Sequence, residues 1–266
     1  MISLNELLAE PASGRRRAVL LDSYDYAKSV FLQGKPVPWQ EPMAYANFFA
    51  QAQSVLKSDL ALLSLDRFYE ERIAADPSLR AAMSAKSRSG YALRSLLGDA
   101  ETTAFVIELA SIFSKTQRVP VVLQIPSPMQ WLALTHPFSG APDASSLDAE
   151  NAENASMYVA DWLRGFAALP LIAVLLDDRR PALGTESVPL SVYSPISNLT
   201  ENYRWALAQR HDDRVELHGS QLSGAVIQAD FWSSDSDLLP AGDFLLGEVP
   251  PSTIPEQVIS RLAALA

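Results

Sequence analysis

The sequence predicts a mixed α/β fold, an irregular (β/α)8 barrel, and three observations support this prediction. Short apolar runs alternate with amphipathic, helix-like segments along most of the 266 residues. Four or five of these runs are apolar at nearly every position, as expected for strands that are buried on both faces. Polar residues follow the runs directly, and barrels of this class carry their active sites at the corresponding strand ends.

The first four strands are the clearest elements of the pattern. They are predicted at residues 18–21, 60–65, 119–125 and 171–176. The intervening segments with helical spacing of apolar residues include 43–57, 78–97, 100–116 and 151–168. A short amphipathic helix within residues 1–16 precedes the first strand, and a single barrel domain is predicted over residues 1–266.

The second half of the pattern is less regular. A fifth strand is predicted at Leu190–Ser194, with a helix at Glu201–Gln209 after it. Three closing strands are expected within residues 214–248, followed by a final helix at 254–266. The connections after the sixth and seventh strands are too short for full helices, so the predicted barrel is irregular.

Composition excludes several classes of protein. The chain has no cysteine, which rules out disulfides, thiol nucleophiles and thiolate zinc sites. A net charge of −10 without a basic stripe disfavours nucleic acids and anionic membranes as partners. No apolar run approaches the ~20 residues that span a bilayer, and no signal-peptide pattern is present, so a cytoplasmic location is expected.

Three polar residues at predicted strand ends are candidates for catalysis. His218 ends the sixth strand, where it should face the barrel mouth, and its imidazole would suit proton transfer near neutral pH. Asp230, on the neighbouring strand, is expected to pair with it. Asp177 and Asp178 are adjacent on a strand and must point to opposite sides, and Asp177 is predicted to face the pocket.

Six further residues at strand ends are predicted to bind a substrate. They are Asp22, Asp66, Gln124, Ser127, Gln228 and Glu248. For Asp22 and Asp66, capping of the helix that follows is an alternative role. For Asp177, the alternative is an ordinary ion pair with Arg179 or Arg180.

Four segments occur in an order that a known superfamily shares. They are Val121–Pro128, a strand with a proline turn; Tyr158–Asp178, a helix and a strand ending in acidic residues; His218–Ser220; and Gly247–Val258, the last strand and helix. In these segments the chain resembles the superfamily of uroporphyrinogen decarboxylase and the C-terminal barrel of cobalamin-independent methionine synthase. The likeness covers residues 119–266 and implies an enzyme that acts on a small molecule.

The departures from this superfamily bear on function. Its zinc methyltransferases bind the metal through a histidine, two thiolates and a carboxylate. Here His218 and Asp230 could match the histidine and the carboxylate, but Ser220 stands at the first thiolate position and the chain has no cysteine. A hydroxyl is a poor zinc ligand. Arg15–Arg17 lacks the context of the decarboxylase's arginine-bearing segment, so porphyrinogen chemistry is not predicted.

These observations predict an enzyme with metal-independent acid–base chemistry on a small organic acid, by decarboxylation, lyase or group-transfer chemistry, and without a cofactor. One alternative is a metal-assisted methyl or alkyl transferase, in which His218, Asp230 and Glu248 would hold zinc or another divalent ion. A second alternative is a non-catalytic barrel that binds a ligand or serves as the subunit of a catalytic partner. A homo-oligomer is compatible with each of these readings.

Overall fold

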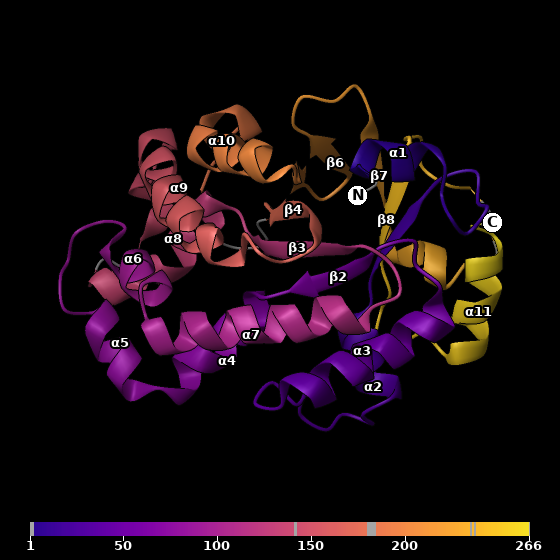
Figure 1. Cartoon of the computed structure of the whole chain (residues 1–266), viewed down its shortest axis with the longest axis horizontal. Coiled ribbons are helices and arrows are strands. Elements are labelled where there is room, and N and C mark those ends of the chain that lie inside the picture. The colour runs from indigo at the N-terminus through magenta and orange to yellow at the C-terminus, as the bar shows by residue number, and fades with distance from the viewer. Residues whose placement is uncertain (1–2, 141–142, 180–184, 235, 237, 266) are drawn as a thin grey trace.

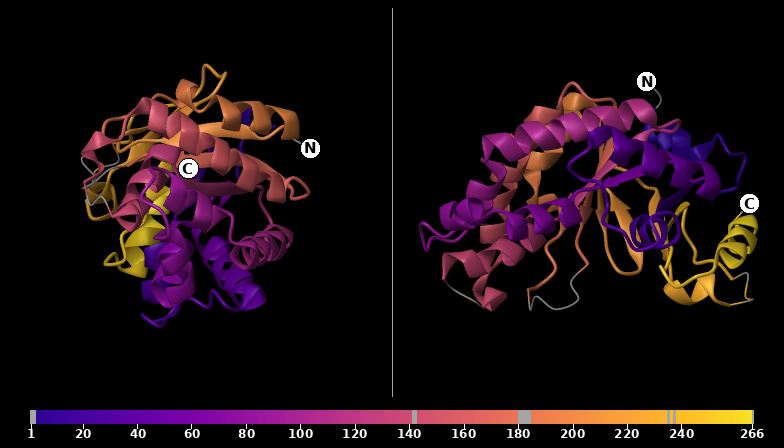
Figure 2. Two further views of the ribbon diagram at one scale, coloured as in Figure 1. Left: turned by 90° about the vertical axis from the view of Figure 1, so that its left-hand side faces the viewer. Right: turned by 90° about the horizontal axis from the view of Figure 1, so that it is seen from below.

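The computed structural model describes residues 3–140, 143–179, 185–234, 236 and 238–265. An eight-stranded sheet in these residues curls into a nearly closed, barrel-like α/β structure with helices packed around it (Figures 1 and 2). The strands are β1 (Val19–Asp22), β2 (Ala61–Ser64), β3 (Val121–Pro126), β4 (Leu171–Asp177), β5 (Ala206–Arg210), β6 (Arg214–Leu217), β7 (Ser223–Ile227) and β8 (Phe244–Glu248). The predicted barrel-like α/β fold is therefore confirmed.

The sheet has the order β1-β8-β7-β6-β5-β4-β3-β2, and one strand runs against the others. The pairs β2/β3, β3/β4, β4/β5, β7/β8 and β8/β1 are parallel. β6 pairs antiparallel with both β5 and β7. Tight connections join these three strands, because a reversal of direction needs no crossover helix.

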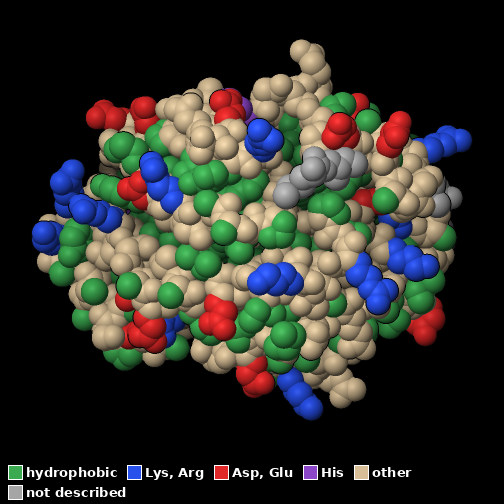
Figure 3. Space-filling view, viewed as in Figure 1, with side chains coloured by type: hydrophobic (Ala, Val, Ile, Leu, Met, Phe, Trp, Pro, Cys, Tyr) green, Lys and Arg blue, Asp and Glu red, His purple; other side chains and the backbone are tan. Residues whose placement is uncertain are grey.

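The helices lie outside the sheet, except that α1 covers one end of the barrel. They are α1 (Leu4–Ala9), α2 (Tyr24–Val30), α3 (Pro42–Leu56), α4 (Asp66–Ala75), α5 (Pro77–Met83), α6 (Tyr91–Leu97), α7 (Ala100–Thr116), α8 (Pro128–Thr135), α9 (Ala149–Leu163), α10 (Ser194–Tyr203) and α11 (Pro255–Ala263). None of the helices in the described ranges is both long and apolar enough to cross a membrane. Charged side chains of both signs are spread over the face seen in Figure 3.

Three predicted elements are wrong. Residues 78–97 form two helices, because the chain turns through Gly90 at a φ of +76° immediately before α6. Leu190–Val192 is a 3-10 turn that leads into α10, so the predicted fifth strand does not form there. The actual fifth strand, β5, lies in the segment that was predicted to be a helix.

The strands alternate between two apolar environments. Every second residue faces the barrel interior, where Leu20, Val122, Leu175, Ala208 and Leu246 pack together. Leu4, Leu7 and Leu8 of α1 belong to the same cluster and close the end of the barrel at which the parallel strands begin. The residues between them on the strands face outward and pack against the helices.

Side chains close the barrel where β1 meets β2. The two strands share a single ladder contact, between Leu20 and Leu60. Next to it the Asp59 carboxylate accepts the Val19 N–H at 2.9 Å, and the Ser58 hydroxyl accepts the Leu21 N–H at 3.0 Å. These two side chains take the place of a regular strand ladder, and we call this junction the seam.

We predict that Asp59→Ala destabilises the protein by about 3 kcal/mol. The Asp59 side chain is only 2% exposed and also binds the Arg15 guanidinium at 3.2 Å. Its removal leaves the buried Val19 N–H without an acceptor and Arg15 with the Lys57 carbonyl alone. Asp59→Asn keeps an oxygen for Val19 and should cost less. Urea denaturation of the three proteins measures this, and a loss below about 1 kcal/mol for Asp59→Ala would show that the seam does not depend on this carboxylate.

Candidate functional site

Polar residues form the last inward-facing layer of the barrel, at the end where the parallel strands finish. They are Asp22, Ser64, Gln124, Asp177, Arg210 and Glu248, one from each of six strands. The register brings them together, since Asp22 pairs with Glu248, Ser64 with Gln124, and Asp177 with Arg210. The layers beneath are apolar, so this layer marks the open mouth of the barrel.

The Arg210 guanidinium lies at the centre of this layer and is 1% exposed. It donates to the Asp22 carboxylate at 2.9 Å, to the Glu248 carboxylate at 2.9 Å and to the Gln124 amide oxygen at 3.2 Å. A buried guanidinium is stable only when carboxylates and other acceptors replace its water. Arg210 therefore fixes the positions of groups from β1, β3 and β8.

A second arginine covers the layer from the outside. Arg179 follows β4, and its guanidinium binds both carboxylate oxygens of Asp177, the shortest contact being 2.6 Å. It also reaches Glu248 at 2.5 Å. Glu248 therefore lies between two guanidinium groups, and the carboxylates at the centre of the mouth are neutralised by protein cations.

Asp66 lies at the edge of this network and has no ion pair among the described residues. Its carboxylate accepts the Ser64 hydroxyl at 2.7 Å, and Ser64 in turn accepts the Gln124 amide at 2.9 Å. Burial raises the pKa of Asp66 above its ordinary value, although the hydrogen bond from Ser64 opposes the shift. Burial and the nearby charge of Asp66 also raise the pKa of Glu70.

A pocket of about 530 Å³ opens above these groups, and we call it the mouth pocket. Its charged lining residues are Asp66, Glu70, Asp177, Asp212 and Glu248, with Arg67 and Arg179. Pro126 and Leu134 supply apolar wall. Arg67 is itself bound to Asp25 at 2.5 Å. Among the described residues the lining therefore has more carboxylates than cations, in a volume that suits a small molecule.

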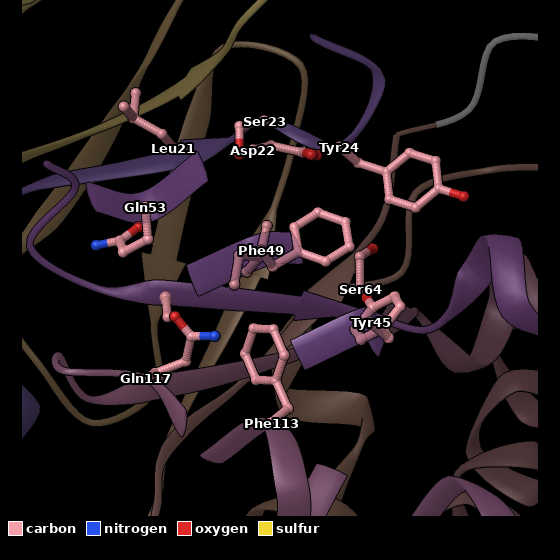
Figure 4. A pocket seen from close by; sticks show the side chains of 12 residues that line it. Leu21, Asp22, Ser23, Tyr24, Tyr45, Phe49, Gln53, Ser64, Phe113 and Gln117 are labelled. Carbon is pink, nitrogen blue, oxygen red and sulfur yellow. The ribbon is translucent and has the colours of Figure 1, made fainter. Parts of the chain in front are cut away.

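A second space follows the seam below the mouth and is shown in Figure 4. Asp22 and Ser64 line it together with the aromatic rings of Tyr45, Phe49 and Phe113. Its volume of about 20 Å³ is close to that of one water molecule, which is too small for a substrate. The mouth pocket is therefore the candidate site for a ligand.

A separate cluster of polar residues lies beside the mouth, on the outward-facing side of the strands. The Ser127 hydroxyl donates to the Asp178 carboxylate at 2.6 Å, and the Ser127 oxygen also caps α8. His211 lies between Asp178 and Glu216, with ring nitrogen to carboxylate distances of 3.9 and 3.6 Å. Ser127 is fully buried and faces away from the mouth pocket, which gives it a structural role in place of the predicted substrate contact.

Five of the residues predicted from strand ends meet at the mouth. They are Asp22, Asp66, Gln124, Asp177 and Glu248. Asp177 faces inward and Asp178 outward, as their adjacency on a strand requires. The predicted alternative for Asp177, an ion pair with Arg179, is also present, so its carboxylate holds a cation while lining the pocket.

The predicted position of His218 is wrong. Because β6 is antiparallel to its neighbours, its final residues lie at the end where the parallel strands begin. The His218 N–H donates to the carbonyl of Leu207, near the start of β5, and its ring lies 3.6 Å from Glu201. His218 is therefore at the opposite end of the barrel from Asp177.

The predicted pair of His218 and Asp230 does not form. Asp230 is an exposed residue of the 3-10 turn after β7, and β7 ends where β6 begins. Gln228 is exposed as well, and its amide donates to the carbonyl of Asp212 at 3.2 Å. Neither residue lines the mouth pocket.

Sequence reasoning missed two residues that hold the site together. Arg210 is not predicted as a site residue because the sequence predicts a helix at Glu201–Gln209, although Ala206–Ala208 is a short apolar run followed by polar residues, as in the other strands. Ser64 was passed over in favour of its neighbour Asp66. Ser64 lies two residues after Leu62 on the same strand, so the two side chains must both face inward, and this spacing could have identified Ser64.

No group of three or more His, Asp or Glu side chains in the described ranges is arranged to hold a metal ion. Comparison of the chain with known protein families, with curated proteins and with solved structures found no match.

We predict that Arg210→Met destabilises the protein by about 3 kcal/mol, because the Asp22 side chain, only 13% exposed, loses its one ion pair among the described residues. Glu248 keeps its ion pair with Arg179. Arg214→Met is the matched control, since Arg214 lies on the next strand, is half exposed and binds only exposed acidic groups. Urea denaturation measures both. Equal, small losses in the two variants would show that Arg210 does not organise the mouth.

The raised pKa of Asp66 predicts a specific pH dependence. Its carboxyl ionises less readily in the folded protein than in the unfolded chain, so the wild type should lose stability relative to Asp66→Asn as pH rises above 3.8. The control is Asp76→Asn, because hydrogen bonds from Ser78 and from the Leu79 N–H lower the pKa of Asp76. The difference in stability between the wild type and Asp76→Asn should therefore change with pH in the opposite direction. Urea denaturation at pH 3, 4.5 and 7 tests both signs, because the Asp66 difference should change above pH 3.8 and the Asp76 difference below it. A constant difference for Asp66→Asn would contradict the assignment.

Proposed function

We propose that the protein is an enzyme that carries out acid–base chemistry on a small molecule in the mouth pocket, with Asp66 as the proton carrier. The observation that supports this proposal is a carboxyl group with a raised pKa that lines a pocket of ligand size. A carboxyl of this kind holds its proton closer to neutral pH than an ordinary one, which a general acid or base requires. The proposed fold is an irregular relative of the (β/α)8 barrel.

Asp66 takes the role that the sequence suggested for His218. Its hydrogen-bond chain through Ser64 and Gln124 to Arg210 holds the carboxylate in one orientation. A second hydrogen-bonded group that orients the proton carrier is a common feature of acid–base sites. Ser64, Gln124 and Arg210 are therefore proposed as positioning residues, and Asp66 as the group that meets the substrate.

The charges of the pocket indicate which part of a substrate it accepts. Arg67, Arg179 and Arg210 are all bound to protein carboxylates, whereas Glu70 and Asp212 make no ion pair among the described residues. A ligand group that carries positive charge or several hydroxyls would complement these carboxylates. We propose a substrate with such a group in place of a simple organic acid, with lyase and group-transfer chemistry as the candidate reactions. Decarboxylation is a candidate only for a substrate that also carries a carboxylate, as an amino acid does.

A binding protein without catalysis is the second candidate. The ion pairs of Arg179 with Asp177 and Glu248 occupy much of the mouth, which would suit a site that only recognises its ligand. A cytoplasmic location, and assembly with itself or with a partner subunit, remain predictions from the sequence.

The test begins with a thermal-shift screen of small amines, amino acids, sugars and carboxylic acids, followed by detection of products by NMR. Asp66→Asn should bind the selected ligand within a few-fold of the wild type but turn it over at least about 100-fold more slowly. Asp230→Asn, at an exposed position of the turn after β7, should behave like the wild type. Ligand binding by the wild type without any product would support the binding protein, and full turnover by Asp66→Asn would contradict the role of Asp66.

A further inference from the structure

A large pocket lies at the other end of the barrel, where the parallel strands begin, and we call it the base pocket. It has a volume of about 890 Å³. The last turns of α3 and α7, the loop before β1 and the residues that lead into β2 form its walls. It is separate from the mouth pocket, with which it shares no lining residue.

The lining of the base pocket is basic, although the chain as a whole carries a net charge of −10. It contains Arg15, Lys57 and Arg118 and one carboxylate, Asp59. Asp59 is 2% exposed, and its charge is balanced by Arg15 at 3.2 Å. The exposed cations Lys57 and Arg118 make no hydrogen bond or ion pair through their side chains among the described residues. In the view of Figure 3, Lys and Arg side chains gather near these ends of α3 and α7.

Cations near helix ends can simply offset the partial negative charge of the last carbonyls. The backbone conformation of Lys57 is a second observation about this position. Lys57 has a φ of +50°, in the left-handed region where a residue after a helix is usually glycine or asparagine. The carbonyl of Lys57 is already bound by Arg15 at 2.7 Å. A long cationic side chain thus stands on the rim of a pocket at a position that glycine usually takes.

We infer that the base pocket binds a phosphate group, either inorganic phosphate or the phosphate of a small organic molecule. Lys57 and Arg118 supply positive charge and N–H donors, which phosphate oxygens accept strongly. The Ser13 oxygen accepts the Arg15 N–H at 3.4 Å, so its own O–H can donate to a ligand. Ala50 and Val119 give apolar wall beside these groups, which would accommodate an organic body.

Binding at the base pocket should stabilise the barrel. Arg15 and Asp59 belong both to the pocket and to the seam, and Gln53 and Gln117 line both the pocket and the space within the seam (Figure 4). A ligand that binds only the folded state raises the unfolding temperature in a concentration-dependent way. This inference does not depend on the reaction proposed for the mouth.

The experiment is thermal denaturation of the full chain against increasing inorganic phosphate or phenyl phosphate, with sodium chloride at matched ionic strength. The wild type should show a saturable rise in unfolding temperature with at least one of the two phosphates and none with chloride. A response to phenyl phosphate alone would identify an organic phosphate as the ligand. The absence of a rise with either phosphate would overturn the proposal.

Lys57→Gly is the decisive variant, because it removes the cation while relieving the left-handed strain and so should fold well. It should weaken phosphate binding about tenfold. Arg204→Gly is the matched control, since Arg204 also ends a helix with a φ of +60° and lies outside the base pocket. An unchanged phosphate response in Lys57→Gly, or an equal loss in Arg204→Gly, would overturn the proposal.

Discussion

The buried guanidinium of Arg210 constrains the rest of the site, because a cation inside a barrel must replace its lost water with acceptors from several strands. Asp22 of β1, Gln124 of β3 and Glu248 of β8 supply them. The apolar layers beneath form the hydrophobic core of the barrel, so the polar layer can line the mouth without interrupting that core. The same contacts leave Asp66 at the edge, where it is bound by Ser64 and has no neutralising ion pair among the described residues.

The direction of one strand decides which polar residues can act together. Because β6 runs antiparallel to its neighbours, His218 lies at the closed end of the barrel and Arg214 lies at the opposite end of the strand. The two ends consequently differ in chemistry. The mouth is rich in carboxylates and has its arginines already paired. The base pocket carries Lys57 and Arg118, whose side chains make no ion pair within the described part of the chain.

Much of the fold could be predicted from the sequence, and the failures have physical causes. The runs of β1 to β4 are apolar on both faces, a pattern that a barrel strand between core and helices must have, and they were located correctly. β5 was missed because Ala, Leu, Gln and Arg are all good helix formers, and only its pairing with β4 decides its conformation. For the site, the rule that polar residues at strand ends face the mouth correctly predicts Asp22, Asp66, Gln124, Asp177 and Glu248. It failed for His218 because local sequence does not encode strand direction.

The most direct test of the account is an NMR titration of the Asp66 side-chain carboxyl in the wild-type protein, with the signal assigned by its loss in Asp66→Asn. The account predicts a midpoint clearly above 3.8, the value for an unperturbed aspartate, because burial beside the Arg210 network disfavours the charged form. A midpoint at or below 3.8 would show that Asp66 is an ordinary ionised carboxylate. It would also remove the basis for proton transfer at the mouth.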